Sequence, residues 1–162
     1  RLSGCRRVLV LATPVTVSES RFAALLRANS SEGCEFVGVP CHELAYMIEN
    51  GKTSEEIENC MSSVFAPYRE EGFDGIVLGC THYPLLSDVI QKHLPNTKLI
   101  SSGESAANAL KEELVVLGLD NNSGGRVEYF TSDDASLFAS NAEKFLKGGL
   151  DGNISHIDIE KY

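Results

Sequence analysis

This sequence of 162 residues lacks the marks of a membrane, secreted or nucleic-acid-binding protein. No apolar run approaches the roughly 20 residues that a membrane-spanning helix needs, and the first residues lack the apolar core and cleavage site of a secretion signal. Positive charge is scarce, since 14 Lys and Arg stand against 23 Asp and Glu, for a formal net charge of -9. Such a chain repels phosphate backbones and anionic lipid surfaces, so we expect no nucleic acid and no membrane as partner, and a cytoplasmic location.

Paired cysteines are also missing. The five cysteines contain no CxxC pair, and their odd number argues against a closed disulfide framework as well as a zinc knuckle. We therefore expect reduced thiols and no metal site. The stretch SGES at residues 102–105 has neither the glycine spacing nor the lysine of a phosphate-binding loop. Small molecules and other proteins remain as partners.

What the sequence does contain is a repeated order of apolar run, turn and helical segment. Strands are expected at Val8–Ala12, Glu35–Val39, Gly75–Leu78, Lys98–Ser101 and Arg126–Phe130. Helices are expected at Ser18–Arg27, His42–Asn50, Ser54–Glu71, Pro84–Leu94, Ser105–Leu117 and Asp133–Lys147. The strands are continuously apolar, which indicates burial on both faces. The fold class is therefore α/β, a parallel sheet covered by helices.

The stretch GCTHYPLL, Gly79–Leu86, follows one of these buried strands. Ligands bind at the carboxyl ends of the strands in open α/β sheets, where helix N-termini converge. A thiol at such a place, close to His82, ionises more readily than a free cysteine and can act as a base or a nucleophile. The alternative is that Cys80 is a small buried residue at the end of a core strand. Taken by themselves, the residues leave these two interpretations evenly balanced.

The same stretch resembles the second catalytic-cysteine motif of the glutamate racemases, cofactor-independent enzymes that interconvert L- and D-glutamate for bacterial peptidoglycan synthesis. Further segments resemble that family, and together they cover nearly the whole chain. They are VLVLATPVTVSESRF, VGVPCHELAYMIENG, SSGESAA and VEYFTSDDASLFASNAEKFLKG. The histidine after Cys-Thr favours a glutamate racemase over the related aspartate racemases, which tend to carry an acidic residue there.

The resemblance implies a catalytic role for three residues. Cys80 matches the thiol that exchanges a proton with the substrate Cα on one face, and His82 matches the neighbour that assists this thiol. Glu49 matches a glutamate that influences the histidine. Because the family uses neither cofactor nor metal, the enzyme itself must provide a strong local base and stabilise a developing carbanion.

The resemblance also implies three substrate-binding residues, Thr81, Thr13 and Thr16. For the last two there is a simpler interpretation as turn and helix-cap residues, with Ser18 as a competing cap. His93 and His156 are expected at the surface.

The sequence also departs from the family pattern. Nothing in it matches the N-terminal Asp-Ser pair or the Cys-Asn-Thr motif that holds the family's first catalytic cysteine. Cys41 is the nearest substitute, and we expect it to serve packing instead. Ser101 stands where the family has aspartate. On the family's two-lobed architecture, residues 5–104 would form the second lobe and residues 105–162 would complete the first.

Our leading hypothesis is a C-terminal portion of a glutamate racemase, nearly inactive by itself. The alternative is a non-catalytic ligand-binding or interaction module built on the same lobe. A racemase for another amino acid is a third possibility. We further expect an exposed apolar surface where the N-terminal part is missing, covered by a homo-oligomer contact or by another chain.

Overall fold

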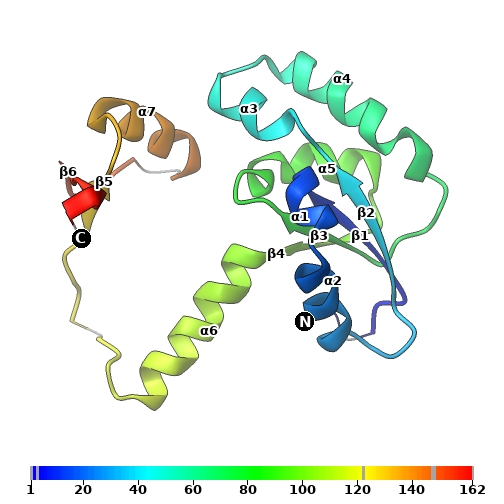
Figure 1. Cartoon of the computed structure of the whole chain (residues 1–162), viewed down its shortest axis with the longest axis horizontal. Helices are drawn as coiled ribbons and strands as arrows, with labels where there is room; N and C mark the ends of the chain where they lie inside the picture. The colour runs from blue at the N-terminus through cyan, green and yellow to red at the C-terminus, as the bar shows by residue number, and fades with distance from the viewer. Residues whose placement is uncertain (1, 3, 122, 147–148, 162) are drawn as a thin grey trace. The chain divides into compact units, whose positions relative to one another are not determined.

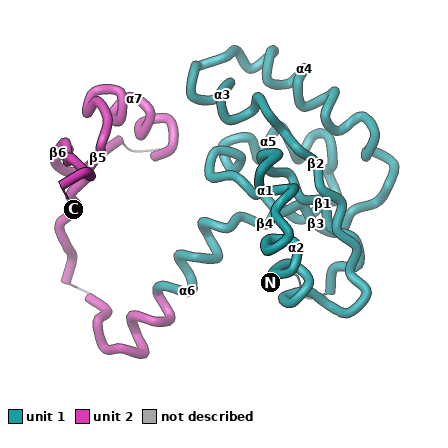
Figure 2. Tube along the Cα trace, in the orientation of Figure 1, with its two compact units in different colours: residues 1–110 teal, residues 111–162 magenta. Residues whose placement is uncertain are grey.

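The structure, a computed structural model, describes residues 2, 4–121, 123–146 and 149–161. The chain divides into two compact units, residues 1–110 and 111–162 (Figure 2). The helix α6 (Ser102–Val116) crosses the boundary between them. We describe each unit by itself.

Unit 1 is built on a parallel sheet of four strands (Figure 1). The strands are β1 (Arg7–Ala12), β2 (Glu35–Pro40), β3 (Gly75–Gly79) and β4 (Lys98–Ser101), in the order β2-β1-β3-β4. The predicted α/β class is confirmed. In the register of the sheet, Ala12 lies opposite both Pro40 and Gly79, so these three strands end at the same level.

Alternate residues of the buried strands supply two separate cores, as the period of two along a strand requires. Leu9 and Leu11 join the first core, together with side chains from three helices. These helices are α3 (Leu44–Glu49), α4 (Ser54–Phe65) and α5 (Ser87–His93). Val8 and Val10 join the second core, against α1 (Pro14–Ser18) and α2 (Ser20–Ala28). Helices therefore cover both faces of the sheet.

The predicted helices differ from the structure in their bounds, most clearly at three places. The helix expected at Pro84–Leu94 begins as a 3-10 turn, η2 (Tyr83–Leu86), and continues as α5. The helix expected at Ser18–Arg27 corresponds to α2, which begins at Ser20 because Glu19 is extended and its carboxylate caps the helix by accepting from the Arg21 amide. The short helix α1 before it was not predicted. The helix expected at Ser54–Glu71 ends at Phe65 and continues as a 3-10 turn, η1 (Ala66–Tyr68). That turn contains Pro67, which has no N–H to continue the α-helical hydrogen bonds.

His93 is not the surface residue that the sequence suggested. Its side chain is only 9% exposed, and its ring lies 5.9 Å from that of Phe65. Nε2 lies 3.1 Å from a Glu58 carboxylate oxygen and Nδ1 lies 3.3 Å from the Arg69 guanidinium. The histidine therefore joins the end of α5 to α4.

Unit 2 contains a parallel pair of strands, β5 (Glu128–Thr131) and β6 (Asn153–His156), with α7 (Ala135–Phe145) between them in the chain. A short 3-10 helix, η3 (Ile159–Lys161), follows. The sequence analysis missed β6, whose four residues include one apolar side chain. Of the helix predicted at Asp133–Lys147, the last residue lies outside the described part of the chain.

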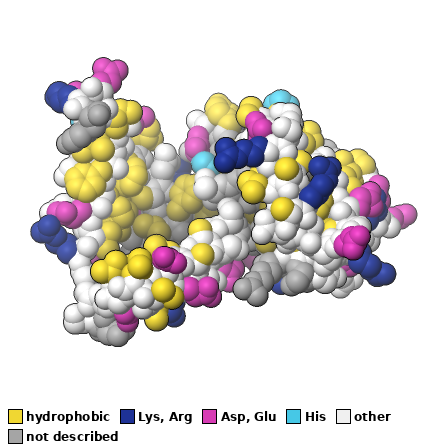
Figure 3. Space-filling model, turned by 60° about the horizontal axis from the view of Figure 1, so that its bottom comes forward, with side chains coloured by type: hydrophobic (Ala, Val, Ile, Leu, Met, Phe, Trp, Pro, Cys, Tyr) yellow, Lys and Arg dark blue, Asp and Glu magenta, His cyan; other side chains and the backbone are white. Residues whose placement is uncertain are grey.

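Apolar side chains lie at the surface of unit 2 (Figure 3). The exposed ones are Val115, Val116, Leu117, Leu119, Val127, Phe130, Leu137, Leu146 and Ile159. The buried apolar residues, in contrast, run only from Leu2 to Leu94 among the residues described. The well-packed core of the protein is thus that of unit 1.

Candidate active site

The predicted site residues gather at the carboxyl edge of the unit 1 sheet. Thr13 follows β1 and Cys80 follows β3, and these two strands are neighbours. Gly79 allows the strand ends to approach closely, because a Cβ at this position would lie 2.6 Å from the Ala12 Cβ and 3.2 Å from the Leu11 carbonyl oxygen. A side chain at residue 79 would therefore separate the two strands where the site begins.

Cys80, His82 and Glu49 form a continuous line of contacts. The Cys80 sulfur lies 3.5 Å from His82 Nδ1, and His82 Nε2 lies 2.7 Å from Glu49 Oε1. Cys80 and His82 follow β3, whereas Glu49 is the last residue of α3, which follows β2. The His82 side chain is 20% exposed and that of Glu49 is 49% exposed. Thiol, imidazole and carboxylate are thus in series, with the thiol partly shielded from solvent.

This order fixes which ring nitrogen of His82 carries the proton. A carboxylate only accepts hydrogen bonds, so Nε2 donates to Glu49. In the neutral ring, Nδ1 is then the acceptor nitrogen, and it is the ring nitrogen that lies 3.5 Å from the Cys80 sulfur. The arrangement can accept the thiol proton and leave a thiolate, and the Glu49 carboxylate stabilises the imidazolium that results.

The three threonines lie beside this line. Thr81 Oγ1 is 3.5 Å from His82 Nδ1. Thr13 and Thr16 contact each other through their hydroxyls at 3.0 Å, where the chain passes from β1 into α1. Thr13 stands at the N-cap position of α1, but its side chain makes no capping hydrogen bond. The structure therefore pairs the two hydroxyls instead of using Thr13 as the cap that the simpler interpretation required.

The remaining positions discussed from the sequence lie close to this edge. Cys41 follows β2, is 4% exposed, and burial, with a smaller contribution from Cys60, raises the pKa of its thiol to about 12. Such a thiol stays protonated and fits a packing role. Ser101 ends β4, and its carbonyl accepts a hydrogen bond from the Ser105 hydroxyl.

Sequence reasoning missed Tyr83, which fastens the cysteine loop. Its side chain is completely buried, and its hydroxyl donates to the Cys41 carbonyl at 3.3 Å. Its amide donates to the Cys80 carbonyl at 3.2 Å. The loop after β3 is thereby attached to the loop after β2, which leads into the helix of Glu49. An aromatic residue with a polar tip, set among polar loop residues, is the pattern that could have indicated this role.

Two general features complete the description of the site. Within the described ranges, no three His, Cys, Asp or Glu side chains are grouped as metal ligands. Among the helices that the structure describes, none is long and apolar enough to span a membrane.

The chain is similar to curated glutamate racemases. The protein of that name from Clostridium kluyveri is 33% identical over 144 residues, which cover 86% of this chain and 55% of the relative. Glutamate racemase 3 of Caldanaerobacter subterraneus subsp. tengcongensis is 30% identical over 162 residues, covering 97% of this chain and 59% of the relative. The chain therefore spans somewhat more than half the length of these relatives.

Solved structures and a family comparison agree with this similarity. The glutamate racemase of Francisella tularensis, crystallised with D-glutamate, superimposes with a TM-score of 0.85 at 25% identity, over 97% of this chain and 59% of that one. Isoform RacE1 from Bacillus anthracis gives a TM-score of 0.83 at 26% identity, over 94% and 57%. The sequence profile of the Asp/Glu/Hydantoin racemase family matches residues 1–110, which are the residues of unit 1. The chain therefore belongs to the Asp/Glu/Hydantoin racemase family.

Proposed function

We propose that this chain provides one half of a glutamate racemase active site, with Cys80 as one of two proton-transfer groups. The observation that carries the proposal is the line from Cys80 through His82 to Glu49 at the carboxyl edge of the sheet. The names of the relatives support glutamate as the substrate. We extend the proposal to a cytoplasmic enzyme of peptidoglycan synthesis.

In the proposed reaction, the Cys80 S–H gives its proton to His82 Nδ1, and the thiolate then removes the Cα proton of glutamate. The Cα–H electron pair remains on the substrate as a carbanion next to the carboxylate. Thr81, Thr13 and Thr16 hold the substrate through their hydroxyls. A hydrogen bond from one of these hydroxyls becomes stronger as negative charge develops on the substrate. It therefore stabilises the transition state of proton removal more than the bound substrate, and this accelerates proton removal.

Inversion requires a second acid on the opposite face of Cα, since a single thiol returns the proton to the side it left. We propose that this acid belongs to the part of the relatives' length that this chain does not span. By itself, the chain would then catalyse hydrogen exchange from one enantiomer without inverting it.

Deuterium exchange tests this proposal. The chain is incubated in D₂O with L-glutamate and, separately, with D-glutamate, and the loss of the Cα proton signal is followed by NMR. We expect exchange from one enantiomer, without inversion, that falls to background in Cys80→Ala. Cys34→Ala, which changes a half-buried thiol before β2, is the matched control and should exchange like the unaltered chain.

The alternative is a ligand-binding or interaction module without catalysis, and the 55% to 59% coverage of the relatives is the observation that favours it. A folded chain that binds glutamate but exchanges neither enantiomer would support the module and refute the half-site. Exchange that persists in Cys80→Ala would assign the proton transfer to another group.

We further propose that the exposed apolar side chains of unit 2 are covered by association, either with a second copy or with another chain. Apolar side chains that gather at the surface of one unit are typical of interaction sites. Light scattering of the purified chain should give a mass above that of a monomer. A monomer that binds no apolar dye would contradict the proposal.

A further inference from the structure

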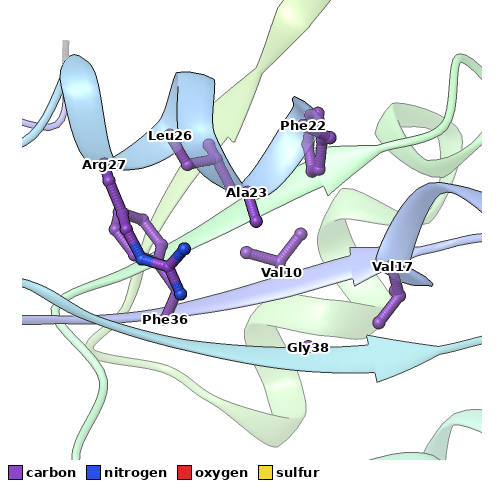
Figure 4. Close-up of a pocket in the computed structure, with 8 residues that line it drawn as sticks. All are labelled: Val10, Val17, Phe22, Ala23, Leu26, Arg27, Phe36 and Gly38. Carbon is purple, nitrogen blue, oxygen red and sulfur yellow. The ribbon is translucent and has the colours of Figure 1, made fainter. Parts of the chain in front are cut away.

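The two faces of the unit 1 sheet differ in how deeply their helices are buried. On the face of α4 and α5, the side chains of Met61, Phe65 and Ile90 are completely inaccessible to solvent. On the other face, α2 contains no buried residue at all. A cavity of about 290 Å³ lies between α2 and the sheet (Figure 4).

This cavity opens to solvent beside the exposed Arg27, and it is large for a helix–sheet interface. Protein interiors are close-packed, and voids larger than a water molecule are few. An apolar cavity of about 150 Å³ is enough to hold benzene, so 290 Å³ leaves room for an apolar body of roughly twice that size. The volume reaches the lower end of the range for ligand pockets, which begins near 300 Å³.

Short side chains create the space. Ala23 on α2 and Gly38 on β2 both line it, and neither extends into it. Val10 lies on the sheet side, and Phe22 lies on the helix side (Figure 4). Val17 covers Gly38, because a Cβ at residue 38 would lie 2.6 Å from Val17 Cγ1, so the space is left mainly by the short side chain of Ala23. Apart from Arg27, the side chains of the lining are thus apolar.

Arg27 is the one charged residue of the lining. It is exposed, and across the described residues its guanidinium takes part in no ion pair. The last-turn carbonyls of α2 already have donors, because Asn29 and Ser30 donate to the carbonyls of Leu25, Leu26 and Arg27. An anion beside Arg27 would therefore meet an available cation and carbonyl groups that are already hydrogen-bonded.

We propose that this cavity binds a monocarboxylate of about eight to twelve non-hydrogen atoms, most of them in an apolar chain or ring. The body lies between Val10 and Phe22, and the carboxylate pairs with Arg27. An apolar pocket with one charged group is the usual composition of a small-molecule site, in which burial gives affinity and the polar group fixes orientation. The cavity lies under α2, on the face of the sheet opposite the Glu49 helix, so the proposal does not depend on the activity of Cys80.

Octanoate and its uncharged analogue 1-octanol are the probes for this proposal. Each is titrated into the full chain, and the methyl NMR signals of Val10, Val17 and Leu26 are followed. We expect saturable shifts with octanoate. Arg27→Gln should weaken octanoate about threefold and leave octanol unchanged, because an ion pair with an exposed arginine contributes about that factor. Arg21→Gln, on the same helix but outside the lining, is the matched control and should bind like the unaltered chain.

A second variant tests the place of binding. Ala23→Phe should fill the cavity and abolish the shifts from both probes, and Ala23→Leu replaces it if the larger side chain prevents folding. The proposal is overturned if octanoate produces no saturable shifts, if it binds equally well to the filled variant, or if Arg27→Gln binds it no more weakly than Arg21→Gln.

Discussion

At the scale of single residues, His82 depends on a partner 33 positions away in the chain, Glu49. We predict that Glu49→Gln slows the alkylation of Cys80 by iodoacetamide at pH 7 about tenfold, because the amide no longer stabilises the imidazolium that forms with the thiolate. The rate is measured by mass spectrometry of the Cys80 peptide.

Glu70→Gln, an exposed carboxylate near the end of η1, is the control for this substitution and should leave the rate unchanged. If Glu49→Gln and Glu70→Gln react at the same rate, Glu49 does not act through His82.

Part of this arrangement could be predicted from the sequence. Cys80 and His82 are two residues apart at a strand end, so their proximity follows from local geometry. The position of Glu49 follows only from the resemblance, since its distance to His82 depends on how α3 packs on the sheet. Tyr83 was missed for the same reason, because its hydrogen bond to Cys41 joins residues 42 apart.

Asp74 gives a pH-dependent contribution to stability at the opposite edge of the sheet. Its carboxylate accepts from the amides of Arg6 and Arg7 at 2.7 and 2.9 Å, and these hydrogen bonds lower the pKa of the carboxyl group. A lowered pKa in the folded state stabilises the protein above the unfolded pKa, near pH 4, and this contribution is lost as the pH falls through the folded pKa.

We therefore predict that Asp74→Asn lowers the urea midpoint at pH 7 and that the difference from the unaltered chain shrinks as the pH falls below about 4. The measurement is urea unfolding followed by circular dichroism at several pH values. Asp151→Asn, an exposed position outside the strands and helices, should show no such convergence. If the difference in urea midpoint does not change with pH, the effect of Asp74→Asn comes from the packing of the side chain and not from its negative charge.

At the scale of the elements, the start of α4 is held by a reciprocal pair of hydrogen bonds. The Thr53 hydroxyl accepts from the Glu56 amide at 3.2 Å, and the Glu56 carboxylate accepts from the Thr53 amide at 2.9 Å. We predict that Thr53→Ala lowers the free energy of unfolding by about 1 kcal/mol. Ser63→Ala, in the same helix but away from its start, should change it by a few tenths of a kcal/mol at most. Urea unfolding measures both variants, and equal effects would contradict the capping role.

The elements themselves were predicted unevenly. The four strands of unit 1 were found because they are short, continuously apolar and followed by turns. The helix α1 was missed, because its five residues are too few to show an apolar periodicity. The strand β6 was missed because its partner β5 comes before α7, and a strand with one apolar residue has no pattern of its own to recognise.

At the scale of the whole molecule, the two units differ in the kind of structure that stabilises them. Unit 1 has two buried cores, whereas the sheet of unit 2 is a pair of parallel strands. Sheets of two strands are marginally stable in water. We predict that the amides of β5 and β6 exchange at least about 100-fold faster than those of β1 and β3, measured by hydrogen exchange and mass spectrometry at low protein concentration.

If the amides of both units exchange equally slowly, contacts other than the pairing of β5 with β6 stabilise unit 2. The fold class could be predicted from the sequence because it depends on the pattern within each strand. The assignment of residues 5–104 and 105–162 to two lobes stays a prediction. The first lobe of the family also includes N-terminal residues, and this chain does not span them.

The close approach of Gly79 to Ala12 has a consequence for how this sequence can vary. A methyl group at residue 79 would lie 2.6 Å from the Ala12 methyl, which is too close for two carbon atoms, so Gly79→Ala alone should be rejected by selection. The exchanged pair, glycine at 12 with alanine at 79, removes the 2.6 Å contact and keeps the number of carbon atoms between the strands. A shift of a few tenths of an ångström then relieves the remaining 3.2 Å contact with the Leu11 carbonyl oxygen. Among homologous sequences, these two positions should therefore covary, and the pair would mark the start of the site even where the cysteine has been replaced.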